Sequence, residues 1–529
     1  MSNTYTVVIK ERSFTDNQII PVFNTTVQGY SWHRWGGPDR SKIVLTGNID
    51  VLKTTFDLLR CPIEIYNERA TRTWWGYVHS VALQMDNLEC SFSLDDMAND
   101  VAVKYSKPAV GSGTQTSDTD FASTSTDSRS INEYGRKQAR PSLNAANSAL
   151  ADGLSAELLD RVKDPFCNEV QVKSSKDVKA ILSCKGWFHS LDWHFPSAET
   201  ATQINVQGST ETSNYLDFGD AVARRYYAQR FQVTQAKGFS LQYADIFVRK
   251  DAATDDIKVE IWTDVAGNPG TLVAGASNVI LNANITSNSI ASPVATTFGN
   301  ISLSPGTDYH IMLSRNPDPT NTTGKFQLST VANYVSGTLQ ISPDQAGWTD
   351  QTTDMNFVIG GARSTEVLIS EILASDAGQF FVDESLFAAN VLMYPLNASS
   401  VRYNALQIVK RLLDYGTSNG RELTVIVTPE RNFTMDEQIV AASDNLRRLN
   451  SDGNVLDSSG ELIPGSELER VVGYFVRPEV ADFVGNISVL KQLNQIYIEA
   501  ADYNVQQGTL RLRPLRAGNP FEISTIKEK

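Results

Sequence analysis

Alternating hydrophobic and polar positions dominate this sequence, and they are clearest over residues 62–106. Ile63 and Ile65 alternate with polar residues, and a second alternating run over 74–85 follows a polar turn. Residues 88–94 repeat the same period after another turn. A period of two places every second side chain of a strand on one face. The segment therefore predicts an antiparallel meander within a small β-barrel, around which we expect the rest of the chain to be organised.

Further strands and helices are predicted along the chain from the same patterns. We expect strands at residues 4–9, 18–28, 42–49, 168–173, 178–183 and 422–428, a pair within 184–195, and a hairpin at 453–463. Apolar positions with a helical period predict helices at residues 51–59, 131–162, 366–373 and 402–414. Ser130 and Glu133 have the spacing of a capping box at the start of the second helix, and Pro141 implies a break inside it.

Changes in composition divide the chain. Residues 107–130 are rich in Ser, Thr, Gly and Asp and predict a linker, because they have little apolar surface to bury. Residues 215–361 carry fewer charges and many short alternating runs, which favour an inserted β-sandwich or jelly roll. The predicted fold class is mainly β with some α (α+β), with several small β-barrel or β-sheet domains. We expect domains at 1–106, 107–214, 215–361 and 362–529.

Charge and cysteine usage limit the function. The net charge of −14 disfavours a protein that binds duplex DNA, which needs a basic surface to neutralise phosphates. The four cysteines lack a metal-ligand spacing and indicate reduced thiols in a chain made in a cytosol. No apolar run of about 18 residues predicts a membrane span, and no signal peptide is expected after Met1.

The segment over residues 29–38 predicts a glycine-rich aromatic loop. Trp32, His33 and Trp35 lie in it, and they suit either a docking loop or a plug at the end of the barrel. The five histidines are widely spaced, so no metal site is predicted, and no cofactor is expected.

The predicted insert contains aromatic residues that can stack on sugar rings: Trp262, Tyr309, Tyr334 and Trp348. Core packing is the alternative for each of them.

The sequence shows no familiar catalytic motif, such as HExxH, GxSxG or a phosphate-binding loop. Adjacent carboxylates such as Asp95 and Asp96 point apart in a strand, whereas a glycosidase needs two that face one cleft. We therefore expect no enzyme activity. A cell-wall hydrolase remains the less favoured alternative.

Three blocks of the sequence, in order, resemble the tail-hub or tail-associated baseplate proteins of long-tailed bacteriophages. They are CPIEIYNER…WWGYVHSV…SLDDMANDVAVKYS, then SINEYGRK with CKGWFHSLDWHF, and then RYNALQIVKRLLDYGTSNGRELTVIVTPER with NVLDSSGELIPG. They cover most of residues 1–200 and 364–529. The insert at 215–361 lies outside this pattern and resembles the jelly-roll modules of secreted and viral surface proteins, which commonly bind carbohydrate or serve as decoration.

The resemblance implies a structural virion protein at the phage tail tip. It implies a homotrimer whose β-domains form a ring, with a distal tail protein, a tape measure protein and tip or fibre proteins as neighbours. DNA would pass through an acidic lumen without specific binding. A host-surface polysaccharide is a further expected partner, and a receptor-binding protein with the insert as its functional part is the alternative.

Overall fold

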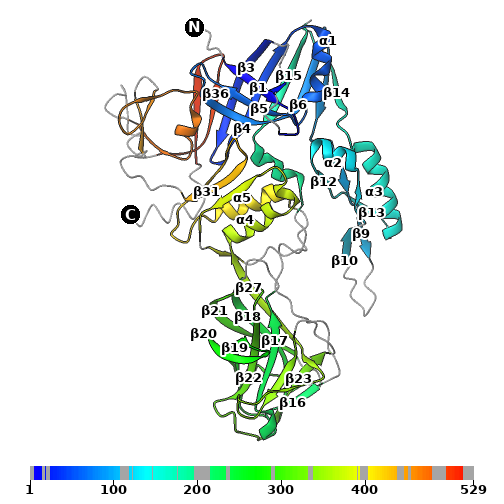
Figure 1. Ribbon diagram of the computed structural model, residues 1–529, viewed down its shortest axis with the longest axis vertical. Helices are drawn as coiled ribbons and strands as arrows, with labels where there is room; N and C mark the ends of the chain where they lie inside the picture. The colour runs from blue at the N-terminus through cyan, green and yellow to red at the C-terminus, as the bar shows by residue number, and fades with distance from the viewer. Residues whose placement is uncertain are drawn as a thin grey trace. The chain divides into compact units, whose positions relative to one another are not determined.

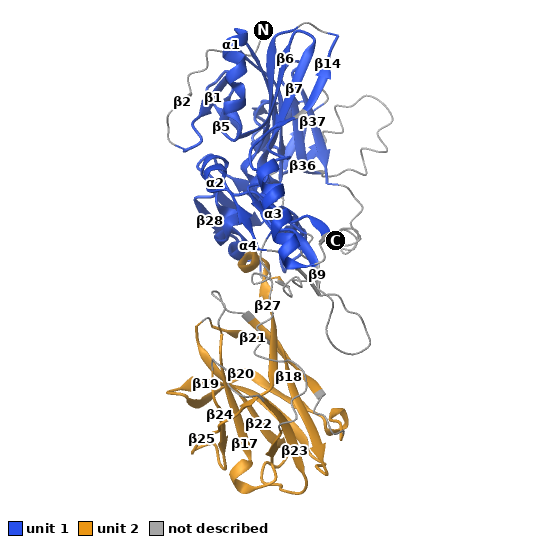
Figure 2. Ribbon diagram, turned by 90° about the vertical axis from the view of Figure 1, so that its right-hand side faces the viewer, with its two compact units in different colours: residues 1–196, 369–389, 401–529 blue, residues 197–368, 390–400 orange. Residues whose placement is uncertain are grey.

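The computed structural model describes residues 5–14, 18–19, 24–107, 118–121, 123–145, 147–174, 177–195, 215–233, 239–287, 292–304, 306–331, 337–389, 391–393, 403–437, 446–450, 454–478 and 496–515. The chain forms two compact units (Figure 2). Unit 1 comprises residues 1–196, 369–389 and 401–529, and unit 2 comprises residues 197–368 and 390–400. The predicted class, mainly β with some α, is confirmed.

The predicted meander lies in unit 1. Strand β5 (Pro62–Tyr66) pairs antiparallel with β6 (Arg72–Met85), and β6 pairs with β7 (Leu88–Ser93). The predicted strands form, but both faces are covered over most of their length, because consecutive residues of β5 and of the first half of β6 are buried. Strand β6 also pairs with β15 (Lys179–Lys185), which extends the sheet beyond the meander.

The aromatic segment at residues 29–38 is a hairpin, and the predicted loop is wrong. Strand β3 (Asn24–His33) pairs with β4 (Trp35–Thr46), and β4 also pairs with β15. Gly36 has a φ of +104°, and a Cβ at this position would lie 2.4 Å from Cβ of Phe188. Only a residue without a side chain allows this close approach, so Gly36 lets Phe188 pack against the backbone of β4.

Strand β3 joins segments from both ends of the chain. Its second edge pairs antiparallel with β36 (Ile496–Asn504), where Gly29 lies opposite Asn504 and His33 lies opposite Ala500. Strand β36 then pairs with β37 (Thr509–Pro514). Figure 1 shows β36, coloured near the red end of the scale, beside the blue N-terminal strands.

The remaining strands of the large sheet system of unit 1 are short. They are β1 (Thr6–Lys10), β2 (Gln18–Ile19), β14 (Cys167–Val172), β28 (Asp383–Leu386), β30 (Leu423–Val427), β31 (Asn432–Glu437), β32 (Leu446–Leu449), β33 (Val455–Leu456), β34 (Leu462–Ile463) and β35 (Phe475–Pro478). The predicted hairpin at 453–463 is confirmed as β33 and β34.

The long helix predicted at residues 131–162 is wrong. Helix α2 (Ser128–Tyr134) ends at Gly135, and α3 (Ser148–Val162) starts after two short strands, β12 (Gln138–Ala139) and β13 (Ser142–Ala145). The cap of α2 is Asp127, whose side chain accepts a hydrogen bond from the Ser130 N–H, so the predicted capping box does not form. Parallel pairing of β12 with β8 (Asp100–Val101) and of β13 with β9 (Lys104–Lys107) provides the tertiary contacts that override helix propensity there.

Two smaller three-stranded sheets complete this part of unit 1. Strand β10 (Asp118–Phe121) pairs with β9, and β11 (Ser125–Thr126) pairs with β8. Residues 107–130, predicted as a linker, therefore contain these two short strands and the start of α2.

The aromatic segment after β15 is also not the predicted strand pair. Residues Trp187–Trp193 form a 3₁₀ helix, η2, that buries both tryptophans. The ring of Trp187 lies 5.1 Å from that of Tyr77, and the ring of Trp193 lies 5.3 Å from that of Phe380. Packing of large rings on three sides therefore outweighs the alternating pattern that suggested a strand.

The helices predicted in the second half of the chain are confirmed. Helix α4 (Thr365–Ala374) matches the segment expected at 366–373. Helix α5 (Ala405–Asp414) has a capping box between Asn404 and Gln407, and it buries Val409 and Leu413. The helix predicted at 51–59 is a short α-helix, α1 (Ile49–Leu52), followed by a 3₁₀ turn, η1 (Lys53–Leu58).

Unit 2 consists mainly of two sheets around one hydrophobic core. The first contains β16 (Tyr215–Phe218), β18 (Phe239–Asp251), β21 (Ser292–Leu303), β23 (Lys325–Val331), β26 (Asp354–Met355), β27 (Phe357–Ser364) and β29 (Leu392–Met393). The second has the order β20 (Asn268–Ile280), β19 (Asp256–Val265), β22 (Asp308–Asn316), β17 (Tyr226–Gln232), β24 (Leu339–Ser342) and β25 (Thr349–Asp350). Both sheets contribute to the core, for example through Ile246 and Ile311.

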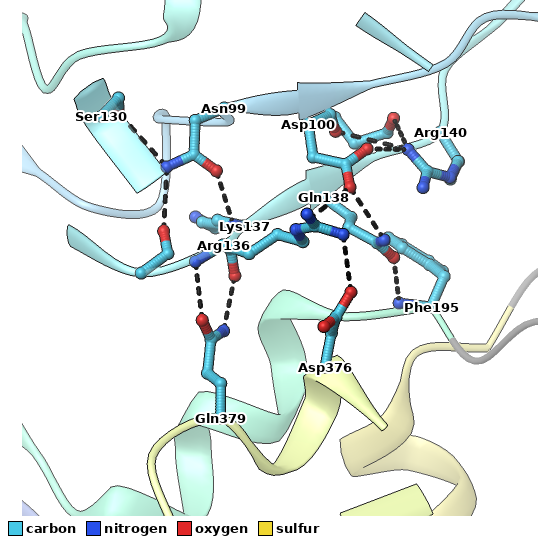
Figure 3. Close-up of polar contacts among 12 residues, drawn as sticks. Asn99, Asp100, Ser130, Arg136, Lys137, Gln138, Arg140, Phe195, Asp376 and Gln379 are labelled. Carbon is cyan, nitrogen blue, oxygen red and sulfur yellow. Dashed lines mark hydrogen bonds and ion pairs between the residues drawn. The ribbon is translucent and has the colours of Figure 1, made fainter. Parts of the chain in front are cut away.

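A polar network, buried at Asp100 and exposed at Arg136 and Asp376, holds distant segments of unit 1 together (Figure 3). Asp100, which is 1% exposed, accepts hydrogen bonds from Arg140 at 2.9 Å and from Gln138 at 3.0 Å. Arg136 pairs with Asp376 at 2.7 Å, and the Gln379 side chain bonds both backbone polar groups of Arg136. The network therefore fastens the segment between α2 and β13 to β8 and to the turn after α4.

We expect Asp100→Ala to lower the free energy of unfolding of unit 1 by about 3 kcal/mol, because it leaves the guanidinium of Arg140 without its buried partner. Urea unfolding followed by tryptophan fluorescence measures this, since six of the eight tryptophans lie in unit 1. Asp160→Ala is the matched control, because Asp160 is exposed and forms a surface ion pair with Lys163. A loss no larger than that of the control would contradict the role of the network.

Candidate functional site

The outer face of the second sheet of unit 2, turned away from the core, brings together polar and apolar side chains from four strands. Leu272, Trp262, His310 and Arg230 lie opposite one another across β20, β19, β22 and β17. We call them the cross-strand row. The neighbouring residues along β19 and β22, such as Ile261 and Ile311, face the core.

A charged cluster forms at one end of the row. Asp264 Oδ1 lies 2.8 Å from His310 Nε2 and 3.4 Å from Arg230 Nε, and Arg230 also forms an ion pair with Asp308. Asp264 Oδ2 accepts a hydrogen bond of 3.0 Å from the Gly267 N–H in the hairpin turn. The side chain of His310 is fully buried within this cluster.

Burial and the neighbouring polar groups together determine which members of the cluster carry a proton. Burial lowers the pKa of His310 below the ordinary histidine value, although the hydrogen bond and charge of Asp264 act in the opposite direction. Burial would raise the pKa of Asp264, but the Gly267 N–H, His310 and Arg230 outweigh it, so this pKa is lowered. The cluster therefore presents a carboxylate and a guanidinium beside a neutral imidazole at neutral pH.

Trp262 lies next to a second polar group. Its Nε1 donates a hydrogen bond to Glu260 at 3.3 Å. Glu260 also forms an ion pair with Lys258 Nζ at 2.5 Å and accepts a hydrogen bond from the Ser277 hydroxyl at 3.3 Å. Across the sheet, Gln340 donates to Asp350 at 2.9 Å and to Asn268 at 3.1 Å. The face therefore carries an aromatic ring beside the Glu260 carboxylate, with further carboxylate and amide groups elsewhere on the same sheet. Such a face provides the apolar and hydrogen-bonding surfaces that a sugar requires.

Part of the outer face is covered by the chain between β24 and β25. The side-chain amide of Gln345 lies 3.9 Å from Sδ of Met312, and the Ser342 hydroxyl accepts the Gln345 N–H at 2.9 Å. Met312 is consequently buried although it points away from the core.

The predicted sugar-stacking residues do not form one group. Trp262 is partly exposed on the outer face. Tyr309 is 6% exposed and lies in the core, where its ring stacks on Phe231 at 5.9 Å, which fits the alternative of core packing. Trp348 is partly exposed directly before β25, and Tyr334 lies outside the described residues.

The predicted docking residues lie in the β3–β4 hairpin of unit 1. Trp32 is buried, donates from Nε1 to the Thr73 carbonyl and contacts Trp75, which fits the alternative of a barrel plug. Trp35 and His33 are partly exposed. Trp35 donates to the Leu423 carbonyl, and His33 lies 3.6 Å from Glu499.

One group in unit 1 contains the residue types of a catalytic triad in a different order. His189 Nε2 lies 2.7 Å from Asp39 Oδ1, and the Ser31 hydroxyl lies 3.2 Å from Asp39 Oδ2. In a Ser-His-Asp triad the imidazole lies between the hydroxyl and the carboxylate, so that it can accept the serine proton. Here the carboxylate is central, and Ser31 has no such contact with His189.

The described residues offer neither a metal site nor a membrane-spanning helix. Three or more His, Cys, Asp or Glu side chains do not converge there in an arrangement suited to a metal ion. Helices in the same residues are too short or too polar to span a bilayer.

Comparisons with known proteins give little further information. No family model matches the sequence, and no curated protein matches it. One solved structure with some similarity is the cycloalternan-forming enzyme from Listeria monocytogenes in complex with a pentasaccharide substrate, at 12% identity over 65% of this chain. The alignment spans 29% of that enzyme, and the TM-score is 0.16, which is too low to support an argument about fold or activity.

Sequence patterns did not identify Arg230, His310 or Asp308 as members of a site. Each is an isolated polar residue in an alternating strand, and the three come together only through the pairing of β17 with β22. The sequence does contain a turn-forming segment beginning at Asp264, but such a segment does not identify the side chains that pack around it.

The lowered pKa of His310 predicts how the stability of unit 2 depends on pH. The buried neutral imidazole stabilises unit 2 fully above about pH 6.5, the ordinary histidine pKa, and this contribution is lost as the pH falls toward the lower pKa of the folded state. The loss is at most about 1.4 kcal/mol per pH unit. Hydrogen exchange of β22 peptides, corrected for intrinsic rates, should show less protection at pH 5.5 than at pH 7.5.

The His310→Gln variant provides the comparison, since His310 is the only histidine of unit 2. We expect a smaller pH effect in this variant. Equal pH effects in the two proteins would show that His310 does not titrate as described.

Proposed function

We propose that this protein is a structural component of a bacteriophage tail tip, a hub that assembles into a homotrimeric ring through its β-domains. The proposal starts from the three ordered blocks that resemble tail-hub proteins. The observation that carries it further is an exposed apolar sheet edge in unit 1, formed by β14.

Strand β14 offers one edge for pairing with another chain. Among the described strands it pairs only with β7. Val170 is 60% exposed and Val172 is 79% exposed, and Phe166 just before the strand is 41% exposed. Monomeric proteins usually protect such an edge with charge, proline or a covering segment, because unpaired backbone groups beside apolar side chains promote association.

The two valines lie on one face of the sheet. They stand opposite Cys90 and Leu88 of β7, and Leu88 is itself 38% exposed. Burial of the valines would contribute roughly 1.5–3 kcal/mol for each side chain. In a closed cyclic assembly each copy would cover this edge with a neighbour, which removes the edge without open-ended growth.

The charge of the chain suits this role. With a net charge of −14 on each chain, a ring that conducts DNA would not retain it through contacts with the phosphates. The proposal places the protein in the virion, between a distal tail protein, a tape measure protein and tip or fibre proteins.

Light scattering on the purified full-length chain tests the proposal. We expect three times the mass of one chain. The double variant Val170→Lys, Val172→Lys should be monomeric, because two charges on the edge oppose strand pairing. Val222→Lys with Val265→Lys is the matched control, since these valines are 55% and 61% exposed in unit 2. A monomeric wild-type chain, or a trimer that survives the edge substitutions, would contradict assembly through β14.

A second function is favoured by the outer face of unit 2. We propose that unit 2 is a jelly-roll module that binds polysaccharide on the host surface, with Trp262 stacking on a sugar ring. The carboxylates and amides on the same face as Trp262 would form hydrogen bonds with the hydroxyl groups of the sugar. This function is compatible with the hub, because the two reside in different units.

Affinity electrophoresis through gels containing dextran, xylan or teichoic acid tests the second function. We expect at least one of these polymers to retard the wild-type chain, and we expect Trp262→Ala to weaken that interaction at least tenfold through loss of the stacking surface. Tyr403→Ala, at a tyrosine that is 44% exposed in unit 1, should have no effect. Equal retardation of the two variants would exclude Trp262 from the binding surface.

A further inference from the structure

A cavity of about 290 Å³ lies in unit 1 beside the turn between β30 and β31. The rings of Phe14, Trp75 and Trp187 form part of its wall, and its polar lining includes Lys10 and Arg431. The volume is close to the lower end of the range of small-ligand pockets, about 300–1,000 Å³. A group of about the size of one amino-acid residue would occupy it.

The aromatic walls are held in place by other contacts. Trp75 donates from Nε1 to the Val427 carbonyl at 2.8 Å, and its ring meets that of Trp32 edge to face at 5.3 Å. Trp187 packs on Tyr77 at 5.1 Å. The cavity is thus preformed, which limits the ordering that a ligand would have to impose.

Some of the charges in the cavity neutralise one another. Glu64 accepts hydrogen bonds from Lys10 at 3.0 Å, from Arg72 at 3.1 Å and from the Tyr66 hydroxyl at 2.6 Å. Arg72 also lies 3.3 Å from Glu430. Lys10 and Arg72 therefore have carboxylate partners already.

Arg431 differs from these two cations. Within the described part of the chain, no carboxylate lies within ion-pair distance of it. Its guanidinium lies 3.6 Å from the centre of the Phe14 ring and donates one hydrogen bond of 3.1 Å to the Phe380 carbonyl. Its backbone has a φ of +70°, which is unfavourable for a residue with a side chain. A strained turn thus directs an unneutralised cation to the cavity wall.

A second such cation lies behind the same ring. Arg60 is 4% exposed, and its guanidinium is 4.9 Å from the Phe14 ring centre. Its Nε and Nη1 have no hydrogen-bond partner in the residues that the structure describes. Burial lowers the pKa of Arg60 to about 10, and Arg12 and Arg431 contribute to the decrease although Cys61 opposes it. The wall around Phe14 therefore carries an excess of positive charge.

We propose that this cavity binds a carboxylate attached to an apolar or aromatic body, with Arg431 pairing with the carboxylate and the aromatic walls contacting the body. A planar guanidinium matches a carboxylate through two parallel hydrogen bonds. The C-terminal residue of a partner chain and a free aromatic acid both offer this chemistry.

Isothermal titration of the full-length protein with N-acetylphenylalanine tests the inference. We expect measurable binding that weakens as the salt concentration rises, and at least tenfold weaker binding of the neutral amide of the same compound. Absence of binding at millimolar concentrations, or equal binding of acid and amide, would overturn the proposal.

Substitution identifies the residue that binds the carboxylate. We expect Arg431→Gln to weaken binding of the acid at least tenfold, whereas Arg421→Gln should change it less than twofold. Arg421 is a suitable control because it lies near the same pair of strands, is 42% exposed in its side chain and pairs with Glu437. An unchanged affinity in Arg431→Gln would also overturn the proposal.

A peptide separates the two sources of the ligand. N-acetyl-trialanyl-phenylalanine has the same terminal group at the end of a short chain. Binding at least as tight as that of the single residue supports the end of a partner chain as the ligand, and weaker binding supports a free acid. Either result agrees with a carboxylate site.

Discussion

The pairing of β3 with β36 is the constraint on which unit 1 depends. One edge of β3 is filled by the strand that follows it, and the other is filled by a strand near the far end of the chain. Loop-closure entropy grows only slowly with length, by about 0.6 kcal/mol for each doubling, so a long intervening segment costs little stability. The cost is kinetic, because the sheet is incomplete until the last strands have been made. This arrangement explains how unit 1 accommodates unit 2, which is inserted between its first and last segments.

Polar groups inside unit 1 fall into two classes with different consequences. Asp100 and Glu64 are buried but saturated with hydrogen bonds, which is the condition under which a buried carboxylate is tolerated. Arg60 and Arg431 each donate one hydrogen bond to a backbone carbonyl, but in the described part of the chain neither has a carboxylate within ion-pair distance. Saturated groups determine how segments are joined, whereas unsaturated ones indicate where a further molecule would be favourable.

The sequence predicts elements well where local pattern and packing agree, as in the meander of β5 to β7 and in α5. It fails where tertiary packing overrides the pattern. The alternating aromatics at Trp187–Trp193 read as a strand, yet rings from other segments hold them in a 3₁₀ helix. Among the candidate site residues, Trp262 and Tyr309 lie on opposite faces of one sheet. That difference depends on strand register, and so does the row that joins Trp262 to His310 and Arg230. The sequence of one strand carries no information about its register with another strand.

The boundaries of unit 2 follow from strand pairing more than from composition. Arg363 and Ser364 of β27 pair with Met393 and Leu392 of β29, and the chain between these two strands includes α4 and a segment assigned to unit 1. The chain therefore enters unit 2 twice, at residues 197–368 and again at residues 390–400. An excision that follows the change in composition and removes only residues 215–361 would keep Arg363 and Ser364, the partners of β29, but would remove the rest of β27. The short pairing of β27 with β29 would then lack the sheet that it extends, so a loss of assembly in such a variant would have a local structural cause as well as a functional one.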